Sequence, residues 1–120
     1  MSSLPLTNYL RANRKRLALT QGEVAFLLGV KVMDKGIKVC RDEKYVREPT
    51  LATALAYAVI YQKPVHELFA GMYEQIKREV AESARILGLR KDRRTGARAE
   101  YRRQVLANLA AREPEELVNT

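Results

Sequence analysis

The feature that most constrains this sequence is the spacing of its apolar residues, which recur every third or fourth position along most of the chain. That period is typical of α-helices that bury one face. The alternation of apolar and polar residues that marks strands is absent from the sequence, and no Asn-Gly or Asp-Gly turn joins two apolar runs. The spacing therefore predicts an all-α fold.

Turn and capping residues divide the pattern into helices. Pro5 favours the start of a first helix, because proline suits the first helical position. Thr20 and Glu23 have the Thr-x-x-Glu spacing of a capping box, which predicts a second helix ending at Gly29. Further helices are expected over about 35–44, 50–61, 66–87 and 97–112.

Charge indicates the class of partner. Lys and Arg number 22 against 14 Asp and Glu, which gives a net charge of +8 and a pI near 9.9. Such an excess favours a polyanion, with nucleic acid ahead of a membrane surface. No apolar run reaches the roughly 18 residues of a membrane span, and residues 1–10 lack the pattern of a signal peptide. We therefore expect a cytoplasmic protein without a membrane partner.

The residues of catalytic and metal sites are scarce. Cys40 is the only cysteine and His66 the only histidine, so neither a zinc site nor a nucleophile–base pair is expected. The sequence has no HExxH, P-loop or GxGxxG motif. We expect no enzyme, no metal and no cofactor.

A helix-turn-helix pattern spans the second and third expected helices. It consists of Leu19-Thr20-Gln21, Val24-Ala25 and Leu28-Gly29-Val30, then Val39-Cys40-Arg41-x-Glu43, Pro49, Thr50-Leu51 and Leu55. Over residues 6–70 it resembles the Cro/phage-repressor-type (XRE) helix-turn-helix family. The resemblance implies a five-helix, repressor-like domain over 1–70 that binds duplex DNA as a transcriptional regulator. It also implies a bacterial or phage-type protein located at the nucleoid.

The third expected helix carries the candidate DNA-binding side chains. Val39 marks its buried side, together with Asp42 and Glu43, and the opposite side is basic. Such a side would direct Lys and Arg at guanine edges and phosphates, although a merely solvated basic face is the alternative. The candidate residues are Gln21, Lys35, Lys38, Arg41, Lys44 and Arg47. Among them Gln21 follows from the resemblance, as a contact to the DNA backbone from the second helix; the alternative is an amide that makes local hydrogen bonds at the start of that helix.

The resemblance also implies a structural ion pair between Arg14 and Glu43; the alternative is two independent surface charges. Two features depart from the family pattern. Eight residues, 31–38, separate Val30 from Val39, which lengthens the turn. Tyr45 occupies a position where glycine is usual.

Residues 71–120 are expected to form a helical extension that includes a basic loop over 90–98. The apolar seam of the fifth helix is longer than a five-helix domain needs. It could contact a second copy, giving a homodimer, or be covered by the last helix. The candidate dimer residues are Met72, Ile76, Val80 and Leu87. The alternative function is an antitoxin-like or adaptor module that uses the same fold mainly to bind a protein partner.

Overall fold

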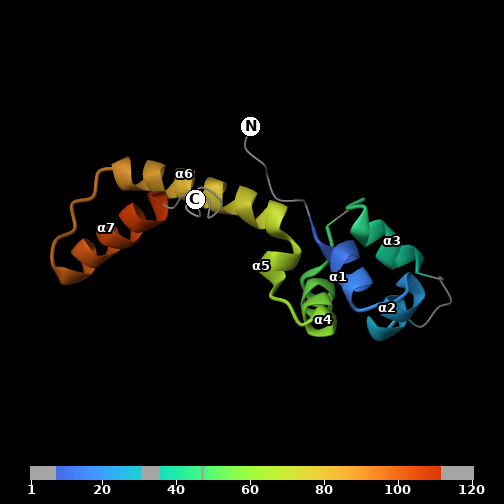
Figure 1. Ribbon diagram of the computed structural model, residues 1–120. Coiled ribbons are helices and arrows are strands. Elements are labelled where there is room, and N and C mark those ends of the chain that lie inside the picture. Colours follow the sequence, from blue (N-terminus) through green and yellow to red (C-terminus); the bar gives the residue numbers. More distant parts are fainter. Residues whose placement is uncertain (1–7, 31–35, 47, 112–120) are drawn as a thin grey trace. The chain divides into compact units, whose positions relative to one another are not determined.

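The computed structural model describes residues 8–30, 36–46 and 48–111. These residues form α-helices and no strand (Figure 1), which confirms the all-α class. The helices are α1 (Leu10–Arg16), α2 (Gln21–Leu27), α3 (Ile37–Glu43), α4 (Leu51–Tyr61), α5 (Val65–Leu68), α6 (Ala70–Leu89) and α7 (Ala97–Ala110). The chain divides into two compact units, Met1–Met72 and Tyr73–Thr120.

The ends of α2 are fixed by local hydrogen bonds. Thr20 Oγ1 accepts a bond from the Glu23 amide at 3.0 Å, and the Glu23 carboxylate accepts one from the Thr20 amide at 2.8 Å. This reciprocal pair is the expected capping box. At the other end Gly29 has a φ of 89°, and its amide bonds to the Phe26 carbonyl while the Val30 amide bonds to that of Ala25. The left-handed glycine thus ends the helix abruptly.

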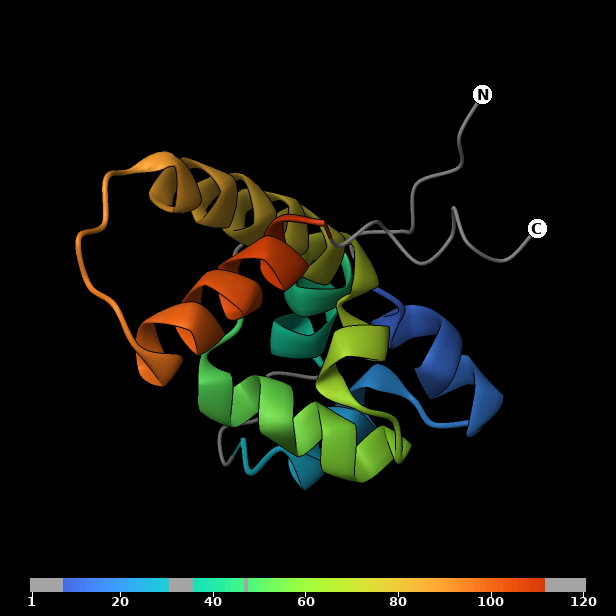
Figure 2. The ribbon, with the colours of Figure 1, turned by 90° about the vertical axis from the view of Figure 1, so that its left-hand side faces the viewer.

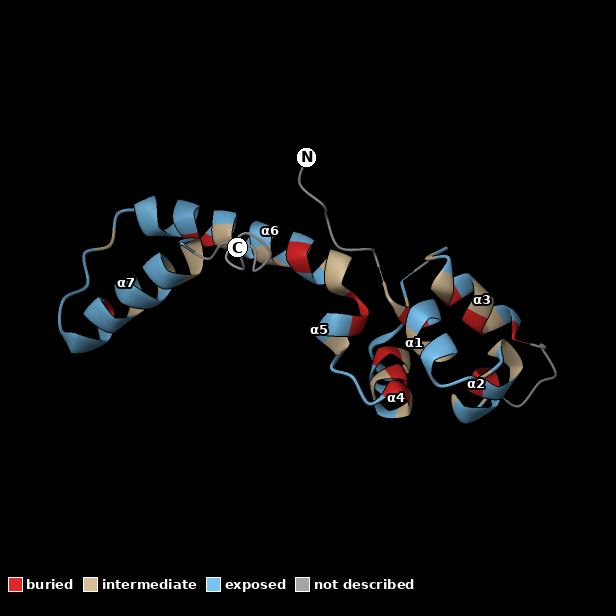
Figure 3. Cartoon of the chain, viewed as in Figure 1, coloured by how far each residue is buried: buried red, intermediate tan, exposed pale blue. Residues whose placement is uncertain are grey.

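The first unit closes around one apolar core. Figure 3 shows the buried residues on the inner sides of its helices. Ala25 is 3 % exposed where α2 faces the core, and its small side chain lets the helices pack closely there. The core consists of Leu10, Val24, Ala25, Val39, Ala54, Tyr57, Tyr61, Leu68 and Phe69.

Helix α4 buries a different side from the one its leucines suggest. Its buried residues are Ala54, Tyr57 and Tyr61. By contrast Leu51, Leu55 and Val59 are 73, 50 and 77 % exposed. These three residues are four positions apart, so they form one apolar stripe on the outer surface of the helix. We call them the α4 stripe.

The prediction of a single helix over 66–87 is wrong in one respect, because Phe69 interrupts the helix. Phe69 has φ −118° and ψ 48°, outside the helical region, and separates α5 from α6. The break lets the consecutive residues Leu68 and Phe69 both enter the core, at 0 and 4 % exposure. The Leu68 carbonyl accepts a 2.7 Å bond from the Tyr9 amide instead of continuing a helical ladder.

The second unit contains most of α6 and all of α7. Figures 1 and 2 both show α7 running back beside α6 after an extended loop. Ala84 of α6 is buried, whereas Ile76, Val80 and Leu87 are 46, 45 and 38 % exposed. The last helix therefore leaves much of the apolar seam uncovered.

Candidate nucleic-acid interface

The start of α3 lies directly against the first turn of α2. Gly36, which precedes α3, is buried and has a φ of 86°. A Cβ atom at this position would lie 2.6 Å from the Gln21 Cβ and 2.9 Å from the Gly22 amide nitrogen. Only glycine fits so close an approach with this backbone conformation. Although eight residues separate Val30 from Val39, α3 begins in contact with α2.

The outer face of α3 presents two cations and one apolar side chain. Ile37, Arg41 and Lys44 are exposed, and their spacing places them on one side of the helix. Arginine can donate two hydrogen bonds to guanine, and a methyl group can contact that of thymine. Ile37 escaped the sequence analysis because an apolar residue at a helix start is normally assigned to the core.

Lys38 differs from its neighbours because it faces a buried carboxylate. Its Nζ atom lies 3.5 Å from Asp42 Oδ2, and the same oxygen accepts a 2.7 Å bond from the Tyr57 hydroxyl. Asp42 is 3 % exposed. Burial raises the pKa of the Tyr57 hydroxyl, and the bond to Asp42 raises it further. Lys38 therefore stabilises the join between α3 and α4, which sets it apart from Arg41 and Lys44.

The neighbouring carboxylate, Glu43, joins α3 to α1 and α2. Arg14 Nε donates to Glu43 Oε2 at 2.6 Å, and Arg14 Nη2 donates to Oε1 at 3.3 Å. The two side chains are 12 and 4 % exposed, so the pair expected from the family resemblance is present and largely buried. The bond to Glu43 raises the pKa of the Arg14 guanidinium, while burial opposes that rise.

Gln21 is part of the same network. Its side-chain amide donates to Glu43 Oε1 at 3.1 Å. This bond positions the first turn of α2 relative to α3, and a contact of Gln21 with the DNA backbone remains a prediction. Two other candidates, Lys35 and Arg47, lie outside the described residues.

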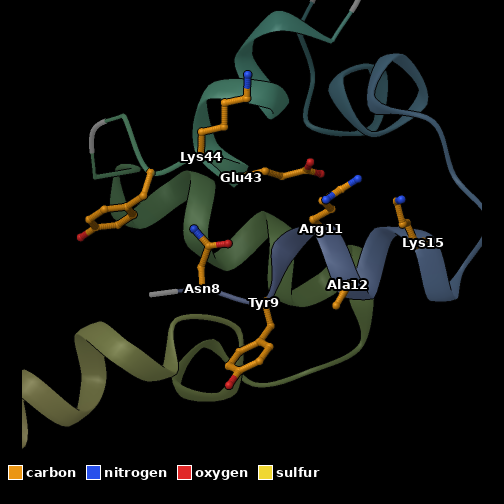
Figure 4. A pocket seen from close by; sticks show the side chains of 8 residues that line it. Asn8, Tyr9, Arg11, Ala12, Lys15, Glu43 and Lys44 are labelled. Carbon is orange, nitrogen blue, oxygen red and sulfur yellow. The ribbon is translucent and has the colours of Figure 1, made fainter. Parts of the chain in front are cut away.

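A hollow of about 500 Å³ lies beside the end of α3. Figure 4 shows Arg11 and Lys15 next to each other on α1, and Glu43 and Lys44 at the end of α3. Because Glu43 is already paired with Arg14, the hollow carries a net positive charge. Arg11 and Lys15 extend the basic surface from α3 onto α1. Their i, i+4 spacing on the first expected helix was the available sequence signal.

The predicted dimer residues do not share one environment. Met72 packs against the core of the first unit. Ile76, Val80 and Leu87 lie in the second unit and are partly exposed. The α4 stripe could not be predicted from the sequence, because leucine and valine in so apolar a helix are usually buried.

No helix among the described residues is long and apolar enough to cross a membrane. Within the same ranges, no cluster of three or more His, Cys, Asp or Glu residues could hold a metal ion. Comparisons with protein-family models, with characterised proteins and with solved structures find no match for this chain.

Proposed function

We propose that this chain is a sequence-specific duplex-DNA-binding regulator of transcription, with α3 in the major groove. The observation that carries the proposal is the exposed face of Ile37, Arg41 and Lys44 on a helix held at both ends. Gly36 lets the start of α3 pack closely against α2, and Glu43 at the end of α3 forms an ion pair with Arg14. A reading helix needs such support, because base contacts require precise placement.

Each side chain of this face has a chemical role in the proposal. Arg41 donates two hydrogen bonds to a guanine, and Ile37 contacts a thymine methyl group. Lys44, with Arg11 and Lys15 at the adjacent hollow, binds phosphates and sets the position of the duplex. Lys38 and Gln21 act indirectly, through the carboxylates of Asp42 and Glu43.

The proposed regulator acts as a homodimer through the α4 stripe. Helix α4 contains no charged residue from Leu51 to Tyr61, and depletion of charge distinguishes the centre of a protein interface. Leu55 lies midway between Leu51 and Val59, so a twofold axis beside it would pair Leu55 with itself and Leu51 with Val59 of the second copy. The proposed dimer contact therefore lies on the α4 stripe and not on the apolar seam of α6.

A second candidate function is an antitoxin-like or adaptor module. The observation that favours it is the partly exposed seam of Ile76, Val80 and Leu87, which a protein partner could cover. In that case the basic face of α3 would contribute little to the main activity.

Selection of bound sequences from a pool of random duplexes tests the proposal. The full chain should enrich a defined sequence and bind it about a thousandfold more tightly than random duplex. A pool whose composition stays unchanged after repeated rounds would leave the adaptor function as the better account.

A further inference from the structure

The loop between α6 and α7 and the helix ends beside it are strongly basic. Residues 85–103 contain eight Lys or Arg and two acidic residues, which gives this segment a net charge of +6. Seven of the eight cations are arginine. Arginine binds phosphate oxygens with two parallel hydrogen bonds, whereas lysine acts as a point charge.

One carboxylate organises this basic loop. Asp92 Oδ1 accepts bonds from the amide and from Nε of Arg94, at 3.1 and 3.0 Å. Asp92 Oδ2 accepts a 3.2 Å bond from Arg102 of α7. Arg103 adds a 2.6 Å bond to the Arg94 carbonyl. The arginines near Asp92 keep the pKa of its carboxyl group below the usual value. The loop is thus bonded to α7, although its sequence suggests a flexible linker.

A hollow of about 350 Å³ lies between α6 and α7 next to this loop. Four arginines line it, while its other lining residues are small or apolar, apart from Asp92. The arginines are Arg85, Arg90, Arg102 and Arg103. Within the described ranges, neither Arg90 nor the neighbouring Arg93 makes an ion pair. We call this site the arginine hollow.

We propose that the arginine hollow is a second DNA site, which binds the phosphate backbone of duplex DNA independently of α3. The inference rests on the proposed function, since it assigns both basic surfaces to one polyanion. Its chemistry fits phosphate and carries no base-reading group. A single-stranded ligand is disfavoured, because such sites stack successive bases on several aromatic rings. Tyr101 is the only aromatic residue in 85–103.

The first test measures affinity for a labelled random-sequence duplex over a range of salt concentrations. The full chain is compared with Arg90→Gln/Arg93→Gln and with a control, Lys63→Gln/Arg78→Gln. Both variants lose two exposed cations, so their net charges are equal. Loss of the Arg90 contact in the hollow and of the Arg93 contact beside it should lower the salt slope by about 2 and weaken binding roughly tenfold, in the first variant only.

The second test separates an organised site from a merely charged loop. Asp92→Asn makes the chain more positive, so a flexible basic loop would bind duplex more tightly. We expect severalfold weaker binding, because the arginines lose the carboxylate that positions them. Circular dichroism should show unchanged helix content. Tighter binding by Asp92→Asn would overturn the proposal.

Other outcomes separate this inference from the proposed function. Equal losses in the loop variant and its control would overturn the arginine hollow but leave reading by α3 intact. A loop-dependent affinity for random duplex, without enrichment of any sequence, would overturn only the regulator proposal. Vesicles of phosphatidylcholine with phosphatidylserine provide the competing anionic surface. If the loop variant lost vesicle binding while its affinity for duplex stayed unchanged, the site would belong to a membrane instead.

Discussion

Two tyrosines of α4, Tyr57 and Tyr61, are equally buried but differ in what their hydroxyl groups contact. The Tyr57 hydroxyl donates to the buried Asp42 carboxylate. The Tyr61 hydroxyl has no hydrogen-bond partner among the described residues. Their rings stack with centroids 5.7 Å apart, a contact that phenylalanine would preserve at either position.

Replacing each tyrosine by phenylalanine should therefore change the stability by different amounts. Tyr57→Phe leaves a buried carboxylate short of a donor and should lower the free energy of unfolding by about 1.5–3 kcal/mol. Tyr61→Phe removes an unsatisfied buried hydroxyl and should be neutral or slightly stabilising. Urea denaturation of the two variants measures the difference. Equal losses would mean that the bond to Asp42 contributes nothing specific.

The Arg14–Glu43 pair can be tested against an exposed pair in the same chain. Glu43→Gln leaves the Arg14 cation largely buried without its counter-charge, and should cost about 3–5 kcal/mol. Glu82 and Arg85 form an exposed pair on α6, whose partners are more than half exposed. Glu82→Gln should leave the thermal midpoint unchanged. If Glu43→Gln and Glu82→Gln had the same thermal midpoint, the Arg14–Glu43 pair would contribute no more to stability than an exposed pair.

Some of these side-chain contacts could be predicted from the sequence, and others could not. The pair of Arg14 with Glu43 was predictable, because the resemblance supplied both positions. The contacts of Asp42 with Tyr57 and Lys38 were not. They depend on how α4 is rotated against α3, and an almost uniformly apolar helix carries no periodic signal for that rotation.

At the scale of elements, the join between α2 and α3 depends on Gly36. A side chain there would meet backbone atoms of Gln21 and Gly22 at 2.8 and 2.9 Å. Gly29 offers a matched control, because it also has a positive φ but no atom within 4 Å of its missing Cβ.

Substitution of either glycine by alanine should lower the stability of the protein, but by different amounts. Gly29→Ala should cost about 1–2 kcal/mol, the penalty for a left-handed alanine. Gly36→Ala adds a steric clash with the backbone, so it should lower the stability further. Because the clash displaces α3, it should also weaken DNA binding. Thermal unfolding and duplex affinity measure both effects. If the two variants behaved alike, α3 would not depend on close contact with α2.

The helix boundaries show what periodicity can and cannot supply. The capping box of α2 and the glycine at its end were predictable, because they are local signals. The break at Phe69 was not. It arises from long-range packing of Leu68 and Phe69 and from the bond between Leu68 and Tyr9, which no local pattern encodes.

At the scale of the whole molecule, the proposed dimer requires that one apolar surface be covered by a second copy. Leu55→Glu places a charge at the centre of the α4 stripe and should give a monomer, whereas Val80→Glu on α6 should remain a dimer. Both residues are about half exposed, so neither change should unfold the chain. Sedimentation of each variant measures its oligomeric state. A monomer from Val80→Glu alone would return the interface to the α6 seam.

The proposed reading of base sequence by α3 depends most on Arg41. Arg41→Ala is compared with Arg78→Ala, an equally simple loss of one exposed cation. The affinity of each variant is measured for the selected duplex and for a random one. Loss of a bidentate guanine contact costs about 1–3 kcal/mol of discrimination. Arg41→Ala should therefore lower the affinity for the selected duplex by roughly 5- to 150-fold and the affinity for the random duplex far less. Arg78→Ala should change neither affinity. An equal loss on both duplexes, or no loss, would contradict reading by α3.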